Sequence, residues 1–377
     1  MHERSVFKPE HELFRATVRH FLASHAAPHH DKWQEQGYVD REVWLKAGEH
    51  GLLLPTVSTD YGGAGATEAM SAVLIEEVAR AKTSGLGFGL HNDIVAPYIE
   101  SYGSEAQKRK YLPQMARGEL IGAIAITEPS AGSDLQGLRT IARRDAGQWV
   151  IDGSKTFVTN GHHADLVIVV ARTDPSAGAM GFSLIVVEKN APGFRKGRVL
   201  KKMGLHARDT CELFFDGART PDENLLGEEG EGLIYLTEKL PWERLQIAIA
   251  AHASAQAAVD HTVAYVQERR AFGQSIGEFQ NTRYKLAECQ TEVEIGRVFA
   301  DRCLELQIAG SLDSETASMA KLWLTEMQGR VLDACVQLHG GYGYMQEYPV
   351  AQAYLDARVQ RIYGGTSEIM KELIGPL

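Results

Sequence analysis

The residues AITEPSAGSD at positions 125–134 mark the point where the pattern of this chain changes. Before them, apolar residues recur at helical spacing, and after them short β-rich runs alternate with turn residues. The stretch itself is typical of a strand end followed by a tight Pro–Gly turn, which can present backbone N–H groups. By itself it predicts only that turn, so its meaning depends on the segments around it.

Upstream of this stretch, the spacing of apolar residues predicts four helices. The first presents Phe14, Val18, Phe21 and Leu22 on one face after Pro9. The other three are expected near residues 41–50, 70–80 and 107–115, the last with Ser104 as its N-cap.

Downstream, short runs separated by turn residues predict a small sheet. Because no crossover helix fits between these runs, antiparallel neighbours are expected. The candidate strands are residues 121–127, 149–152, 156–158, 166–170, 182–187 and 212–215.

After Gly232 the helical pattern returns. We expect a long helix over 245–270 with Pro241 at its start, a second over 286–308, a third ending at Gly340, and a short one ending at Leu373. The order of helices, sheet and helices predicts a mainly α fold with a central β domain, not a doubly wound fold. The expected domains are 1–120, 121–226 and 227–377.

Composition narrows the function further. The chain has 377 residues and a net charge of −10, so no basic face for nucleic acid is expected. No apolar run is long enough to cross a membrane and no secretory signal is visible. The four cysteines lack zinc spacing, no metal site is expected, and nucleotide-binding glycine motifs and the nucleophile elbow are absent from the sequence.

Four further stretches carry a combined signal with the first one. They are KTFVTNG at 155–161, ERRAFG at 268–273 followed by Gln280, QLHGGYG at 337–343, and YGGTSE at 363–368. In this order and spacing they closely resemble the acyl-CoA dehydrogenase family, over nearly the whole chain. The resemblance implies an N-terminal helical domain, a middle β-barrel or sheet domain, a C-terminal four-helix bundle, and FAD as cofactor.

The resemblance also assigns roles to residues. Thr127, Ser133, Phe157 and Thr159 would contact the flavin ring, with Ser133 also beside the substrate thioester; many relatives have Trp at the position of Phe157. A second set would contact the cofactor across a subunit boundary or at helix ends: Arg269, Phe272, Gln280, Gln337, Gly340, Gly341, Thr366 and Glu368. Tyr363, Gly364 and Arg244 would bind the substrate.

The base for α-proton removal departs from the commonest family pattern. Most members place a Glu directly after the Tyr of the last motif, where this chain has Gly364. In the long-chain and isovaleryl branches, the base lies at the start of an earlier helix and is followed by Arg. Glu243 and Arg244 match that arrangement, so Glu243 is the expected base. A first-turn position would lower its pKa, whereas a dry pocket would raise it.

The sequence most resembles the long-chain branch, so we expect a medium-to-long, straight or branched acyl-CoA as substrate. Isovaleryl-CoA, a redox-silent flavin-binding subunit and an oxygen-using relative remain alternatives. Gly87 and Gly89 would either leave room for the acyl tail or allow close helix packing. The family also implies electron-transfer flavoprotein as electron acceptor and a homotetramer built as a dimer of dimers. The location would be the cytoplasm for a bacterial chain or the mitochondrial matrix for a processed eukaryotic one. Gln352 stands where relatives usually have Lys or Arg.

Overall fold

The computed structural model describes residues 4–81 and 83–375. Its N-terminal part is helical. Its helices share one apolar core that includes Trp33, Trp44 and Phe88. As predicted, Ser104 caps the last of them by accepting a hydrogen bond from the Gln107 N–H. The helices are α1 (Pro9–Phe21), α2 (His30–Gln36), α3 (Glu42–Glu49), α4 (Glu68–Arg80), α5 (Phe88–Leu90), α6 (Ala96–Tyr102) and α7 (Glu105–Ala116).

The middle part is a sheet whose strand order is β6-β7-β3-β2-β4-β5-β8, with β1 paired to β4. Alternate residues of its strands form a second apolar core around Trp149 and Val167. The strands are β1 (Gly122–Ala125), β2 (Ile141–Asp145), β3 (Gln148–Thr159), β4 (Leu166–Arg172), β5 (Phe182–Glu188), β6 (Phe194–Val199), β7 (Thr210–Pro221) and β8 (Leu225–Leu226).

The expectation of purely antiparallel neighbours is wrong in one region of this sheet. Strand β1 pairs in parallel with β4, and Ile141 of β2 makes a parallel contact with Arg172 of β4. The chain between β1 and β4 holds the β2–β3 hairpin, which is long enough to return the chain to the same edge without a helix. The remaining paired strands run antiparallel.

The C-terminal part is a bundle of helices around α8 (Gly232–Glu268), α9 (Gln280–Ile308), α10 (Ser314–His339) and α11 (Pro349–Ala357). The short α12 (Ser367–Ile374) follows, and a small hairpin of β9 (Arg270–Ala271) and β10 (Gln274–Ser275) joins α8 to α9. Pro241 was expected at a helix start, but α8 begins at Gly232 and contains it. A buried helix with extensive tertiary contacts tolerates the one hydrogen bond that proline removes.

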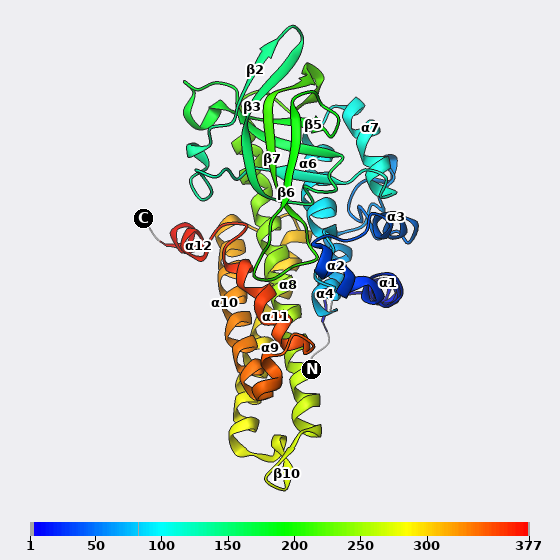
Figure 1. The fold of residues 1–377 in the computed structure, drawn as a ribbon, viewed down its shortest axis with the longest axis vertical. Coiled ribbons are helices and arrows are strands. Elements are labelled where there is room, and N and C mark those ends of the chain that lie inside the picture. The colour runs from blue at the N-terminus through cyan, green and yellow to red at the C-terminus, as the bar shows by residue number, and fades with distance from the viewer. Residues whose placement is uncertain (1–3, 82, 376–377) are drawn as a thin grey trace.

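These three parts meet along α8. Figure 1 shows the sheet at one end of the molecule, the C-terminal helices extending to the other end, and the N-terminal helices against their shared flank. Helix α8 packs against α4, α9, α10 and α11, and so links the helical parts. Within the described residues, no helix is long and apolar enough to cross a membrane. The predicted domain ends at 1–3 and 376–377 lie outside the described residues.

Candidate active site

A cavity of about 920 Å³ lies where the three parts of the fold meet. The segment from α4 to α5, the ends of β1 and β3, one face of α8, and helix α11 with the residues after it all contribute to its walls. Eight of the predicted site residues line it together: Thr127, Ser133, Phe157, Thr159, Glu243, Arg244, Tyr363 and Gly364. Residues more than 230 positions apart in the sequence therefore reach one chamber, as their assigned roles require.

A buried ion pair between β3 and the turn that follows β1 holds this turn in place. The Lys155 ammonium lies 2.8 Å from Glu128 and also donates to the Ile126 carbonyl at 2.9 Å. The Glu128 carboxylate accepts two further hydrogen bonds, from the backbone N–H groups of Arg139 and Thr140. Burial lowers the pKa of Lys155 to about 8, while Glu128 opposes this shift. This network fixes the turn that carries Thr127 and Ser133.

Strand β3 presents Phe157 through a bulge. Its register against β7 shifts between Lys155 and Val158, which leaves Phe157 with a φ of +57° and 66% exposed. A non-glycine residue in this left-handed region is uncommon and occurs at functional sites. Thr159 follows and also lines the cavity. An exposed aromatic face beside hydroxyl groups fits the flat ring and polar edge of a flavin.

Glu243 projects from the middle of α8, not from its first turn. Its carboxylate accepts a hydrogen bond from the fully buried Tyr98 hydroxyl at 3.0 Å. Burial raises the pKa of Glu243 to about 7, against the lowering effects of Tyr98, Arg244 and Lys239. The expected lowering by a helix N-terminus is wrong, because α8 begins eleven residues earlier. The group is a half-buried carboxyl that faces a cavity and titrates near neutral pH, as a general base requires.

Arg244 is not a surface residue paired with Glu243. It is buried and donates to the hydroxyls of Ser314 and Ser318 at 2.9 and 3.1 Å. Burial lowers its pKa, and Glu243 opposes that shift. A guanidinium on the cavity wall that hydrogen-bonds only neutral groups within the described chain remains available to an anionic or polar ligand group.

The segment after α11 brings Gly364 against α8. Gly364 has a φ of +63°, and a Cβ atom there would lie 2.5 Å from the Ile247 Cδ1 atom. Ile247 is one turn after Glu243, so α8 fills the space next to the position where most relatives carry the base. The fully buried Lys321 ammonium donates to the Gly365 carbonyl oxygen and holds this segment in place.

Gly87 and Gly89, both near the cavity, lack a side chain for different structural reasons. A Cβ atom on Gly87 would lie 1.8 Å from the Asn160 amide oxygen, so that glycine permits close packing. Around Gly89 the nearest such atom is 3.9 Å away, and the residue opens onto the cavity. Close packing therefore explains Gly87, whereas the open space beside Gly89 leaves room for an acyl tail as a prediction.

A second hollow of about 580 Å³ lies at the far end of α8. Four more predicted residues line it: Arg269, Gln337, Gly340 and Gly341. Arg269 lies 26 residues after Glu243, which corresponds to about 39 Å along a helix. The first cavity extends along α8 as far as His261, and the second hollow begins beyond it, so the predicted residues fall into two separate groups along this helix.

Four predicted residues line neither hollow. Phe272 is 95% exposed near the tip of the β9–β10 hairpin, and the exposed Gln280 side chain hydrogen-bonds the Tyr284 hydroxyl. Thr366 caps α12 through the Ile369 N–H, and Glu368 is exposed in the first turn of that helix. The structure does not bring these four to either hollow within one chain, and their roles stay predictions.

The fold and the site together define a class of protein. A half-buried carboxyl and an exposed aromatic side chain that line one cavity between helical and sheet domains are typical of a flavin-dependent oxidoreductase.

Comparison with known proteins narrows this class. Family models of the acyl-CoA dehydrogenase N-terminal, middle and C-terminal domains match residues 8–119, 123–218 and 230–376. The chain is 52% identical to the mitochondrial long-chain specific acyl-CoA dehydrogenase of Mus musculus, over 98% of this chain and 87% of that protein.

Solved structures agree with this match. An acyl-CoA dehydrogenase from Geobacillus kaustophilus has a TM-score of 0.97 and 50% identity, over 99% of this chain and 98% of that one. A glutaryl-CoA dehydrogenase from Mycobacterium smegmatis in complex with FADH2 has a TM-score of 0.92 and 30% identity, covering 98% and 94%. The chain belongs to the acyl-CoA dehydrogenase family, whose cofactor is FAD.

Proposed function

We propose that this enzyme oxidises a medium-to-long acyl-CoA to the trans-2-enoyl-CoA, with Glu243 as the base. The observation that carries the proposal is the Glu243 carboxyl, which lines the same cavity as Phe157 and Thr159 and whose pKa burial raises to about 7. Bound FAD supplies the acceptor for the hydride that leaves the β-carbon.

Two groups act on the acyl thioester. The Gly364 N–H donates to the thioester oxygen, which stabilises the negative charge that develops there as the α-proton leaves. The Glu243 carboxylate takes that proton, and the Tyr98 hydroxyl fixes the position of the carboxylate. The buried Lys321 holds the adjacent Gly365 carbonyl and so fixes the Gly364 segment.

Cavity length supports a long acyl chain over isovaleryl-CoA. Residues of α8 line the cavity at spacings of three or four from Glu243 to His261, which corresponds to about 27 Å. The fifteen carbon–carbon bonds of a sixteen-carbon acyl chain, at about 1.5 Å each, measure at most about 23 Å. A short branched acyl group would leave most of the cavity length unfilled, and would therefore make fewer favourable apolar contacts with the cavity wall.

The two hollows support an oligomer in which each FAD contacts two chains. The flavin ring would lie against Thr127, Ser133, Phe157 and Thr159 of one chain, and the Arg269 hollow of a second copy would hold the remainder. This arrangement fits the proposed homotetramer, because a symmetric contact between chains would bring the second hollow of one chain to the cavity of another. Electron-transfer flavoprotein is the proposed electron acceptor.

The test is anaerobic addition of palmitoyl-, octanoyl- and isovaleryl-CoA to the purified flavoprotein. We expect palmitoyl-CoA to bleach the flavin absorbance fastest, and Glu243→Gln to abolish bleaching. Glu238→Gln is the matched control, because this carboxylate on the same helix bonds Tyr102 instead.

Other outcomes would support the alternatives. Equal bleaching by the Glu243 variant would exclude it as the base. Bound flavin that no thioester bleaches would favour the redox-silent subunit, and rapid reoxidation of reduced flavin in air would favour an oxygen-using enzyme.

A further inference from the structure

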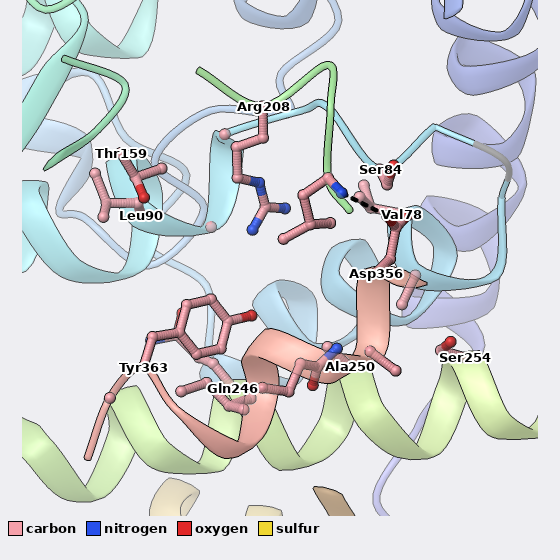
Figure 2. A pocket seen from close by; sticks show the side chains of 18 of the residues that line it. Val78, Ser84, Leu90, Thr159, Arg208, Gln246, Ala250, Ser254, Asp356 and Tyr363 are labelled. Carbon is pink, nitrogen blue, oxygen red and sulfur yellow. Dashed lines mark hydrogen bonds between the residues drawn. The ribbon is translucent and has the colours of Figure 1, made fainter. Parts of the chain in front are cut away.

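Arg208 places a guanidinium in the active-site cavity. It lies on the loop before β7, and it lines the cavity with Leu86, Leu205 and Tyr363. Figure 2 shows its side chain reaching from that loop into the chamber, toward the Tyr363 ring. Neither the sequence motifs nor the proposed reaction uses this residue.

The guanidinium is poorly satisfied within the described part of the chain. One terminal nitrogen donates to the Leu86 carbonyl at 3.3 Å, a long hydrogen bond. The Nε atom is buried and has no partner. The Tyr363 hydroxyl interacts with the guanidinium, and the ion pairs of the described residues include none between Arg208 and a carboxylate. Burying a guanidinium without enough hydrogen-bond acceptors costs desolvation free energy, unless a ligand supplies the missing acceptor.

The charged groups around Arg208 already have other partners. Asp356 accepts hydrogen bonds from the Leu205 N–H and from Gln352 at 2.5 and 2.6 Å. Gln352 thus keeps a contact to Asp356 without supplying a cation. Asp209 accepts from the His162 N–H, and Lys202 donates to the Arg208 carbonyl. None of these groups neutralises the Arg208 side chain.

The surroundings indicate which anion would fit. The walls near Arg208 include the apolar side chains of Val78, Leu90 and Ala250, which suit methylene groups. Tyr363 directly precedes Gly364, where the thioester oxygen would bind, and its hydroxyl end interacts with the Arg208 side chain, so Arg208 is separated from the reacting end by the Tyr363 side chain. A carboxylate that reaches it would therefore be carried on the same acyl chain, several methylenes from the thioester.

We propose that Arg208 is a subsite for a carboxylate on the acyl chain, so that the enzyme also oxidises ω-carboxyacyl-CoA thioesters. The inference rests on the proposed function, since it assumes that an acyl thioester occupies the cavity. A bidentate guanidinium–carboxylate contact would supply the acceptors that Arg208 lacks. Straight-chain substrates would pass the same residue without this contact.

The test compares adipyl-, suberyl- and sebacyl-CoA with hexanoyl-, octanoyl- and decanoyl-CoA on the holoenzyme. In Arg208→Gln we expect kcat/KM for the best ω-carboxy substrate to fall by about tenfold or more, the loss typical of a charged hydrogen bond. For the straight chain of equal length it should change by less than about threefold. Arg195→Gln is the control, because Arg195 is exposed on β6 and stacks on Phe214.

Calorimetry with non-oxidisable thioether analogues of suberyl-CoA and octanoyl-CoA measures binding without turnover. Tighter binding of the carboxylated analogue to the wild type than to Arg208→Gln would support the subsite. Equal losses for both kinds of ligand, or a wild type that neither binds nor oxidises ω-carboxy thioesters, would overturn it. If neither octanoyl-CoA nor palmitoyl-CoA bleaches the flavin, the proposed function fails, while the binding measurement still reports on Arg208.

Discussion

The hydrogen bond from Tyr98 to Glu243 gives the site its first sharp test. The hydroxyl stabilises the ionised carboxylate, so its removal in Tyr98→Phe should raise the pKa of Glu243 above about 7. The base acts only when ionised, and the rising limb of kcat/KM against pH should therefore move upward. A hydrogen bond to a charged group corresponds to a shift of about one to two pH units.

The pH profile has an internal control one turn along α6. Tyr102→Phe removes a similar bond, from the Tyr102 hydroxyl to Glu238, without touching the base. We expect its profile to match the wild type. An unchanged profile in Tyr98→Phe would mean that Tyr98 does not set the ionisation of Glu243.

A substitution at Gly364 tests whether the backbone conformation at this residue is needed for catalysis. Its φ of +63° and the nearby Ile247 side chain both oppose a Cβ atom. Gly364→Ala should lower kcat by shifting the N–H that binds the thioester oxygen, and should cost about 1–2 kcal/mol of stability from the left-handed backbone. Gly310→Ala is the matched control, because it has a φ of +65° on the surface with open space around it. It should lose comparable stability but keep full kcat, and equal kcat in both variants would contradict the role of Gly364.

At the scale of elements, strand β3 connects stability to cofactor binding. Lys155→Met would leave Glu128 buried without its cation, a change that typically costs about 3–5 kcal/mol. We expect a lower thermal midpoint and weaker flavin retention, because the turn that carries Thr127 and Ser133 loses its anchor. The double variant Lys155→Met/Glu128→Gln should recover much of the stability, since no buried charge remains. No recovery would mean that packing by Lys155, not charge pairing, holds the turn.

The elements differ in how far the sequence predicts them. Helical spacing located the long helices, because burial of one face repeats along each of them. Strands β2 and β6 escaped prediction because charged residues fill their exposed positions, and α11 was missed although Pro349 is a good first residue. Pro241 misplaced the start of α8, since local proline preference yields to the packing of a long buried helix.

The site shows the same division. Glu243 was predicted from its motif; the fold places it on the cavity wall, and its role as the base stays a prediction. Tyr98 is 145 residues away along the chain, and Lys321 and Arg208 also come from distant segments. Only the fold brings these residues together, so no local pattern indicates them. In the sequence, a Lys or a Tyr on a helix gives no sign of a functional role until the residue that it contacts is known.

At the scale of the whole molecule, the two hollows of each chain predict intersubunit complementation. If one FAD site uses Glu243 of one chain and Arg269 of another, Glu243→Gln and Arg269→Ala should each be inactive alone, the second through lost FAD. Mixed oligomers contain some sites with both residues intact. Co-refolding or coexpression at equal amounts should therefore restore about a quarter of wild-type activity, as expected for random pairing across symmetric interfaces. Arg270→Ala is the control for Arg269, because the Arg270 side chain is adjacent in sequence but donates to the Gly273 carbonyl. We expect this variant to keep its FAD. Failure of the mixture to regain activity, with mixed oligomers confirmed by mass, would place both residues in the site of a single chain, or exclude Arg269 from the cofactor site.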